Sequence, residues 1–381
     1  MKHKIIDLLK ERVLVLDGAM GTQIQQAELS EEDFRGERFR DWTCALKGNN
    51  DLLSLVQPHL IYAIHQSYLE AGADIIATNT FNAQAISLLD YRMTHLVHEI
   101  NYEAAQLARK AVEVYETITP NKPRFVSGSI GPTNRTTSMS PRVEDPMYRA
   151  VTFDEMRLAY KEQIIALIEG GVDLLLIETI FDTLNAKAAL FAADEVREEM
   201  NKPIPVMISA TITDKSGRTL SGQTLEAFLA SVSHVDCLSI GLNCAFGARE
   251  MYPHLKELSR LAPCFISAHP NAGLPNQLGE YDETPQSMAS QVKEFLDEGL
   301  VNIIGGCCGT NPQHIAALVK LARTAQPHIP VEKPKYMWLS GLELFEAKPE
   351  MNFINVGERC NVAGSRRFLR LINEKKYEEA L

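Results

Sequence analysis

The chain contains a short and almost purely apolar run, Asp173-Leu-Leu-Leu-Ile-Glu178. A continuous apolar run of this length is typical of a parallel strand that is covered on both faces. The residues before it, 153–169, place apolar side chains at helical spacing, and the residues after it, 184–200, are rich in Ala and Glu. This helix–strand–helix order predicts one unit of an α/β protein.

The same pattern recurs along the chain. Short apolar runs end in polar or glycine residues, and helical patterns separate most of them, with further helices expected at 224–233 and 288–296. Eight strands are expected, at 13–17, 74–78, 124–128, 173–178, 205–210, 237–242, 264–268 and 301–305. Eight strand–helix repeats predict an α/β fold, a (β/α)8 barrel of the TIM type. An open doubly wound sheet is the alternative, but no Gly-x-Gly-x-x-Gly follows the first run.

The chain divides into three parts. We expect the barrel to occupy residues 1–326, and the prolines that follow predict a linker at 327–350. A strand-like run at 352–358 and a helix at 368–380 indicate that 351–381 is the beginning of a second, incomplete domain. Within the barrel, the connection 22–55 is too long for an ordinary strand–helix loop, which is typical of functional or lid-like segments.

Composition excludes several classes of partner. The 38 Lys and Arg residues against 49 Asp and Glu give a net charge of -11, which argues against nucleic acid or an anionic membrane. Three acidic residues interrupt the most apolar stretch, 164–180, so no membrane span is expected, and charges at 7–12 argue against a signal peptide. Seven cysteines at irregular spacing do not indicate a disulfide framework, which favours a reducing cytoplasm.

Three cysteines follow two of the expected strands. Cys244 follows the sixth, and Cys307 and Cys308 follow the eighth, at the barrel face that carries the chemistry in this fold. Three thiolates favour zinc and leave a fourth ligand position open. Adjacent cysteines can share one ion only if the backbone leaves strand geometry, which the flanking glycines permit. Two core thiols are the alternative, as we expect for the remaining cysteines Cys44, Cys237 and Cys264.

The charge of such a centre limits its chemistry. Three thiolates on Zn²⁺ make a net negative site, which is a poor activator of water but can hold a substrate thiol as a thiolate. The predicted reaction is therefore attack of a substrate thiolate on an alkyl group. No covalent enzyme intermediate and no catalytic residue beyond the zinc site are expected.

These motifs carry a family resemblance. Asp17-Gly-Ala-Met-Gly-Thr22, Gly241-Leu-Asn-Cys244 and Gly305-Gly-Cys-Cys-Gly309 together resemble the homocysteine S-methyltransferase family. Further segments are similar to its cobalamin-dependent members: 33–39, 48–51, 78–81, 131–135, 181–187 and 269–275. The run Asn355-Val-Gly-Glu-Arg-Cys-Asn361 resembles the opening of the pterin- or folate-binding domain that follows the barrel in those members, which the betaine- and methylmethionine-dependent relatives lack. Cys360 often aligns with Thr there and is not counted as a ligand.

The resemblance implies a zinc-bearing barrel in which Cys244, Cys307 and Cys308 are the metal ligands and homocysteine is methylated to methionine. It implies methylcobalamin as donor, held by a cobalamin-binding module in cis or in trans and recharged from 5-methyltetrahydrofolate through the following domain. Methylmethionine or betaine as donor, a homocysteine-binding fragment without turnover, and a zinc-stabilised structural barrel remain alternatives.

The carboxylate and ammonium groups of homocysteine also need binding partners. The backbone N–H groups of Gly18, Ala19, Met20, Gly21 and Thr22 could bind its carboxylate. Asp17 and Glu178 end the first and fourth strands, and the resemblance points to this pair for the ammonium group. Ordinary structural roles, a turn-stabilising Asp and a hydrogen-bonded Glu, are the alternatives. Asn243 is expected to contact the substrate and is a candidate to orient the metal site. His269 is a further candidate to orient it, with ordinary packing as the alternative.

Overall fold

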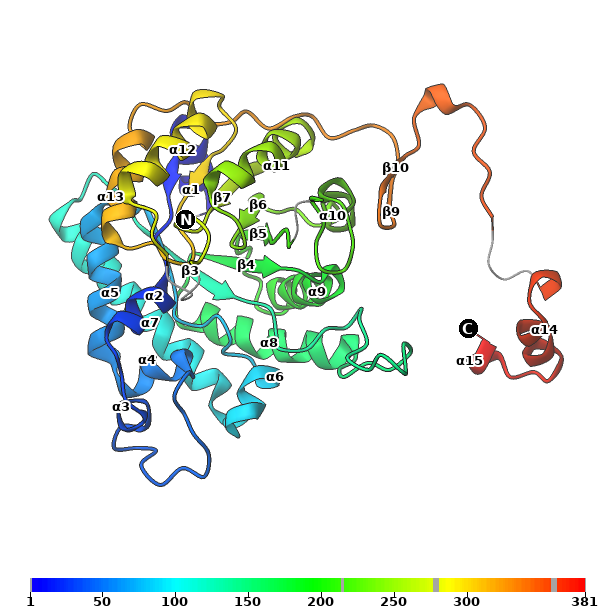
Figure 1. Ribbon diagram of the computed structural model, residues 1–381, viewed down its shortest axis with the longest axis horizontal. Coiled ribbons are helices and arrows are strands. Elements are labelled where there is room, and N and C mark those ends of the chain that lie inside the picture. Colours follow the sequence, from blue (N-terminus) through cyan, green and yellow to red (C-terminus); the bar gives the residue numbers. More distant parts are fainter. Residues whose placement is uncertain (1, 214–215, 277–280, 358–361, 381) are drawn as a thin grey trace.

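Eight parallel strands form one sheet in the computed structural model, which describes residues 2–213, 216–276, 281–357 and 362–380 (Figure 1). The sheet order is β1-β8-β7-β6-β5-β4-β3-β2, and a parallel bridge between Leu16 and Ile75 joins β1 to β2. The strands are β1 (Leu14–Val15), β2 (Ile75–Ala77), β3 (Phe125–Ile130), β4 (Leu174–Ile180), β5 (Val206–Ala210), β6 (Ser239–Asn243), β7 (Phe265–His269) and β8 (Ile303–Ile304). The predicted (β/α)8 barrel is confirmed, and the open sheet is excluded.

Helices surround the outside of this sheet (Figure 1). The helix expected at 153–169 is α8 (Phe153–Glu169), because Thr152 and Glu155 form a capping box that fixes where it begins. The other three expected helices shift by a few residues, to α9 (Thr183–Glu199), α10 (Leu225–Val232) and α12 (Pro285–Asp297). The remaining long helices are α1 (Lys2–Glu11), α5 (Pro58–Ala71), α7 (Val97–Ile118), α11 (Ala248–Leu261) and α13 (Pro312–Ala322). None of the described helices is both long and apolar enough to cross a bilayer.

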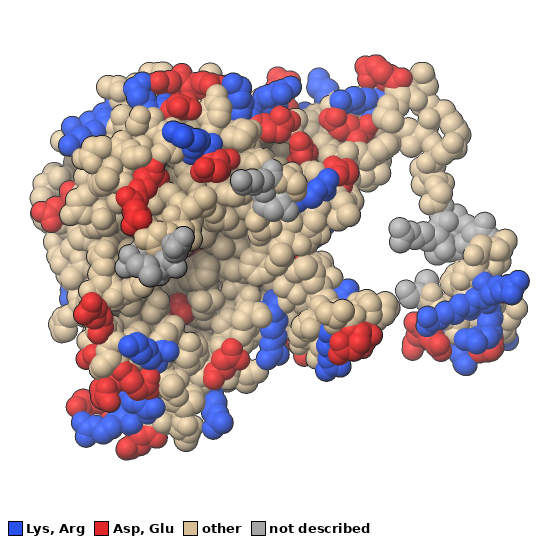
Figure 2. Space-filling model, in the orientation of Figure 1, with Lys and Arg blue, Asp and Glu red and all other residues tan. Residues whose placement is uncertain are grey.

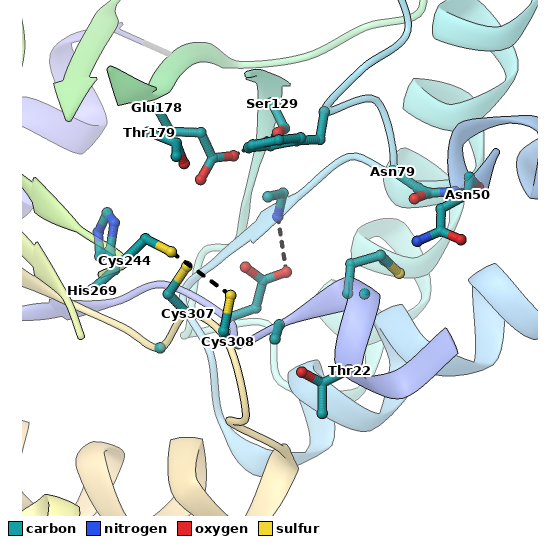
Figure 3. Close-up of a pocket in the computed structure, with 18 of the residues that line it drawn as sticks. Thr22, Asn50, Asn79, Ser129, Glu178, Thr179, Cys244, His269, Cys307 and Cys308 are labelled. Carbon is teal, nitrogen blue, oxygen red and sulfur yellow. Dashed lines mark hydrogen bonds between the residues drawn. The ribbon is translucent and has the colours of Figure 1, made fainter. Parts of the chain in front are cut away.

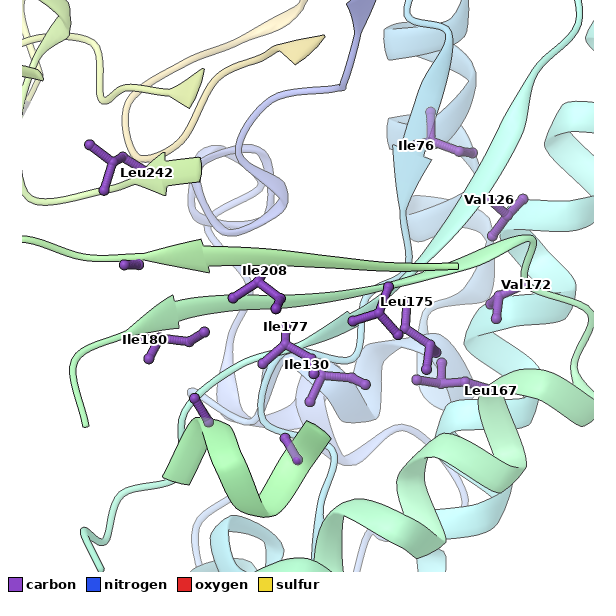
Figure 4. Packing of buried hydrophobic residues seen from close by; sticks show 14 of the residues in the cluster. Ile76, Val126, Ile130, Leu167, Val172, Leu175, Ile177, Ile180, Ile208 and Leu242 are labelled. Atoms are coloured by element: carbon purple, nitrogen blue, oxygen red, sulfur yellow. The ribbon is translucent and has the colours of Figure 1, made fainter. Parts of the chain in front are cut away.

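Apolar side chains fill two layers. One strand face packs against the outer helices, as Val126, Leu175 and Leu167 of α8 show (Figure 4). The other face points into the barrel, where Ile5 and Leu9 of α1 pack with inward strand residues such as those of β1 and β8. Both faces of the strands are therefore buried, which explains their continuous apolar runs. The opposite end of the barrel, where the C-terminal ends of the strands lie, carries polar groups.

The long connection after β1 folds back against the barrel. It holds α2 (Met20–Gln26), α3 (Glu31–Arg35), a 3-10 turn (Asn50–Leu52) and α4 (Leu53–Val56). Buried apolar residues such as Phe34 and Leu46 anchor it. Further short elements are α6 (Ala85–Leu88) and 3-10 turns at Leu89–Tyr91, Thr94–Leu96, Pro349–Met351 and Val362–Gly364.

Part of the expected linker is ordered. A hairpin of β9 (Trp338–Ser340) and β10 (Leu344–Glu346) packs on α10. The Ser340 hydroxyl donates to the Ala227 carbonyl at 2.7 Å, and the Thr224 N–H donates to the Leu342 carbonyl at 2.9 Å. The sequence did not predict this hairpin, because contacts with a distant helix hold it.

The C-terminal expectations need correction. Residues 352–357 form no strand, because a strand needs a hydrogen-bonded neighbour and none of the described strands pairs with this run. The remainder of the 355–361 motif, with Cys360, lies outside the described residues. The expected helix 368–380 is two helices, α14 (Arg366–Asn373) and α15 (Tyr377–Ala380), separated where Lys375 adopts a φ of 58°. Figure 1 shows both apart from the barrel.

Candidate active site

A cavity of about 420 Å³ opens at the C-terminal end of the barrel. Figure 2 shows this face hollowed, with basic and acidic side chains interspersed around it. Its walls include the turn after β1, the end of β4 and the loops after β6 and β8. The connection 22–55 contributes Thr22, Gln25, Gly48, Asn50 and Asp51 to the lining. This long connection is thus part of the cavity wall.

Three thiols meet on one side of the cavity. The sulfurs of Cys244, Cys307 and Cys308 all lie within 4.8 Å of one another, and Cys244 Sγ is 3.7 Å from Cys308 Sγ (Figure 3). Two thiolates on a tetrahedral zinc ion with Zn–S bonds of about 2.3 Å would lie about 3.8 Å apart. The spacing of the three sulfurs therefore fits a zinc ion. No other such cluster of ligating side chains occurs among the described residues.

The backbone around the cysteines departs from strand geometry. Cys244 has a φ of 62° and Ala245 a φ of 58°, so the chain turns sharply where β6 ends. The Cys307 N–H donates to Pro270 O and the Cys308 carbonyl accepts from Ala272 N, both at 2.9 Å, so the segment after β7 holds both cysteines. Gly309 has a φ of 81°, and a Cβ there would lie 2.3 Å from Tyr281 Cβ.

The Asn243 side chain lies against the three-cysteine centre. Its amide oxygen accepts from the Thr179 N–H at 2.9 Å and from the Ser209 hydroxyl at 2.7 Å, and its amide nitrogen lies 3.9 Å from Cys307 Sγ. It is buried and, unlike the other expected substrate-binding residues, does not line the cavity. The structure thus places Asn243 against the metal site, with β4 and β5 holding its amide.

Two carboxyl groups, from buried Asp17 and half-buried Glu178, face the same cavity. Asp17 accepts from the Ala77 N–H at 2.9 Å, and burial raises its pKa, with the Glu178 charge adding to the effect. Glu178 accepts from the Ser129 hydroxyl at 2.5 Å, and burial raises its pKa to about 7 (Figure 3). An ammonium group near both would favour their ionised forms.

The turn Gly18–Thr22 lines the cavity beside these acids. At Gly21 an added Cβ would meet nothing within 4 Å, whereas at Gly18 it would lie 2.8 Å from Thr310 Oγ1. Close packing therefore requires Gly18, and Gly21 leaves open space. The Thr22 hydroxyl accepts from the Gly309 N–H at 3.0 Å, which ties this turn to the loop of Cys307 and Cys308.

Sequence reasoning missed Tyr281. Its hydroxyl interacts with the Cys308 thiol and helps to lower the pKa of that thiol, and Tyr281 lines the cavity from the connection between β7 and α12, where no motif drew notice. His269, a candidate from the sequence, is buried beside Cys244 and lines the cavity (Figure 3). Neither of its ring nitrogens has a hydrogen-bond partner among the described residues. Burial lowers its pKa to about 4, so the ring is neutral near pH 7.

Replacing Tyr281 with Phe is expected to weaken zinc binding about tenfold, because second-layer hydrogen bonds orient metal ligands. Competition with a chromogenic chelator measures the affinity. Tyr377→Phe, an exposed tyrosine, is the matched control. Equal zinc affinity of Tyr281→Phe and the unmodified chain would contradict this role.

Asp51 makes the stability of the fold depend on pH. It is buried, accepts from the Asn82 N–H at 3.1 Å, and burial raises its pKa to about 7. Ionising Asp51 in the folded state lowers the free energy of unfolding. This loss is absent below pH about 4, grows as the pH rises from the unfolded to the folded pKa, and is complete above pH about 7. Asp51→Asn, which keeps the acceptor oxygen, is expected to stabilise the protein by roughly 2–4 kcal/mol at pH 8 and little at pH 4.

Urea unfolding at the two pH values measures this difference. Asp90→Asn, a change at an exposed carboxylate, is the control. A gain from Asp51→Asn that is the same at both pH values would show that ionisation is not its cause.

Fold and site together define a (β/α)8-barrel protein with a three-cysteine centre at the C-terminal mouth of the barrel. The family description "Homocysteine S-methyltransferase" matches residues 14–322, and the chain belongs to this family. Its structure is similar to that of the homocysteine methyltransferase MmuM from Escherichia coli. The metallated form of that protein is 24% identical, with a TM-score of 0.61, over 84% of this chain and 99% of the other. The apo form is 23% identical, with a TM-score of 0.56, over 81% and 96%. At this identity the likeness supports the fold.

Proposed function

We propose that this chain is the homocysteine-methylating barrel of a cobalamin-dependent methionine synthase, with zinc as its resident metal. One observation carries the proposal: three thiols and two carboxyl groups face a single cavity. A thiol amino acid has the complementary groups, a sulfur for the metal and an ammonium for the acids. Family membership makes homocysteine that amino acid.

The substrate's amino acid end would lie against the first and fourth strands. Asp17 and Glu178 bind the ammonium group, whose charge offsets the cost of burying theirs. The backbone of Gly18, Ala19, Met20, Gly21 and Thr22 binds the carboxylate, since this turn lines the cavity and no side chain caps the helix that begins at Met20.

The protein's part in the reaction is to hold the metal ion and to orient the substrate. When bound at the three cysteines, Zn²⁺ supplies the positive charge that keeps the substrate thiol ionised near neutral pH. Cys244, Cys307 and Cys308 would hold the ion, and Asn243 and Tyr281 lie against cysteine sulfurs and would keep them in position. A thiolate attacks a methyl group without proton transfer, so no general acid or base is required of the cavity.

The donor we propose is methylcobalamin, presented by a separate module in cis or in trans and recharged from 5-methyltetrahydrofolate by a following domain. The resemblance of residues 355–361 to the opening of that domain supports it, as does the division expected from the sequence into a barrel (1–326), a linker (327–350) and a second domain beginning at 351. Similarity to the Escherichia coli homocysteine methyltransferase fits a methylmethionine or betaine donor equally well. A cytoplasmic location stays a prediction from composition.

The donor is tested by assaying methionine formation by the zinc-loaded chain with homocysteine and methylcobalamin, methylmethionine or betaine. We expect turnover with methylcobalamin and none with methylmethionine or betaine. Turnover with either of those two donors would replace this proposal. Homocysteine binding without turnover from any donor identifies a binding fragment. Zinc X-ray absorption provides a separate test: homocysteine should raise the number of sulfur ligands from three to four, and an unchanged shell supports a structural zinc.

A further inference from the structure

A second pair of thiols lies at the opposite end of the barrel from the candidate active site. Cys237 precedes β6 and Cys264 precedes β7, which is its hydrogen-bonded neighbour, and their sulfurs are 3.3 Å apart. Both side chains are partly exposed. Both also line a cavity of about 240 Å³, with Ile6, Pro205, Pro263 and Pro330 among its other walls. The pair is therefore accessible and has space beside it.

The spacing distinguishes this pair from the three-cysteine centre. A separation of 3.3 Å is shorter than the roughly 3.8 Å expected of two thiolates on a tetrahedral metal ion, and no third ligating side chain joins them among the described residues. A disulfide bond of about 2.05 Å requires the sulfurs to approach by little more than 1 Å. The strand register pairs Ser239 with Phe265, so Cys237 lies one residue out of register with Cys264. A strand spacing of about 4.8 Å and a rise of about 3.3 Å then place the two Cα atoms roughly 5.8 Å apart, within the usual range for a disulfide. Side-chain rotation can therefore close the bond.

The two thiols act as a pair. Cys237 donates a hydrogen bond to the Cys264 sulfur, and when one thiol ionises the other can donate a hydrogen bond to its thiolate. The thiolate is the attacking form of a cysteine. Either cysteine can therefore begin the reaction, and its neighbour is placed to resolve what forms on it.

We propose that Cys237 and Cys264 form a redox-active dithiol whose oxidants are low-molecular-weight disulfides of the glutathione class. The thiolate of one cysteine attacks one sulfur of RS–SR, which forms a mixed disulfide on that cysteine and releases RS⁻. The other cysteine loses its proton to solvent and attacks the modified cysteine sulfur, forming the Cys237–Cys264 bond and releasing a second RS⁻. The two thiolates take up protons, so two protein thiols are oxidised as one RS–SR is reduced to two RSH. The adjoining cavity offers room for the R group of the mixed disulfide.

The test uses the full zinc-loaded chain in buffers of increasing oxidised-to-reduced glutathione ratio, followed by acid quenching, alkylation and mass spectrometry. Chymotryptic cleavage after Leu242 separates Cys237 from Cys244, so the cross-linked peptide identifies its own cysteines. The expected product is a Cys237–Cys264 cross-link, with two thiols lost and zinc content unchanged. Cys264→Ser should stop at a glutathione mixed disulfide on Cys237, and Cys237→Ser should stop at one on Cys264, because neither variant retains the second thiol that closes the cross-link.

Cys44→Ser is the matched control, because it removes a partly buried thiol elsewhere and should leave the cross-link intact. Phenylarsine oxide, which binds two adjacent thiols together, tests the unmodified chain and should protect Cys237 and Cys264 jointly from alkylation. Absence of the cross-link at every glutathione ratio would overturn the proposal, as would independent alkylation of the two cysteines in the presence of phenylarsine oxide. Neither result depends on methyltransferase activity.

Discussion

Replacing Cys307 with alanine is expected to remove zinc from the protein and to abolish homocysteine binding with it. Cys307 approaches both other thiols, and two cysteines alone leave a zinc ion with half of a tetrahedral shell. Elemental analysis should fall from about one zinc per chain to near zero. Calorimetric titration with homocysteine should fall from a clear binding curve to none.

The matched control is Cys44→Ala, which removes a thiol that is not part of the cluster. Thermal melting in a chelator should give similar values for Cys307→Ala and the unmodified chain, because the strand cores do not depend on this side chain. Full zinc content together with unchanged homocysteine affinity in Cys307→Ala would refute the metal assignment.

Replacing Glu178 with glutamine is expected to weaken homocysteine binding by roughly 30- to 150-fold while zinc is retained. Glutamine keeps the shape of the side chain and loses the negative charge, and a charged hydrogen bond contributes about 2–3 kcal/mol. Calorimetry with homocysteine measures the loss. A des-amino analogue, 4-mercaptobutanoate, lacks the ammonium group and should bind the variant and the unmodified chain alike.

Asp154→Asn controls for the general loss of a negative charge, because Asp154 is exposed on α8. An equal loss of affinity for homocysteine and for 4-mercaptobutanoate would mean that Glu178 acts on the thiol end or on the fold. In that case Asp17 would be the remaining candidate for the ammonium group.

Much of the barrel could be predicted because its signals are local. Each strand is a short apolar run, and the boundary of α8 follows from Thr152 and Glu155 three residues apart. The positions of the three cysteines at strand ends were also readable, because strands six and eight flank strand seven in a closed barrel. Residue type and strand order together therefore indicated where the thiols would meet.

The features that were missed depend on contacts between distant segments. Tyr281 reaches Cys308 from a connection without a motif, and the hairpin β9–β10 is held by α10. Asn243 follows the pattern of a cavity residue, but three hydrogen bonds to Thr179 and Ser209 turn its amide behind the cysteines. The strand expected at 352–358 was wrong over its described part, because local β propensity does not supply a pairing partner.

The hydrogen bond between Thr22 and Gly309 has a consequence for substrate choice. It joins the turn that would bind the carboxylate to the loop that carries two of the sulfurs. The distance between the carboxylate site and the sulfur site is thereby fixed. Cysteine is one methylene shorter than homocysteine and would fail to satisfy both ends at once. A preference of about 10- to 200-fold, the usual value of one methylene, would then arise from backbone geometry, with no side chain dedicated to excluding the smaller amino acid.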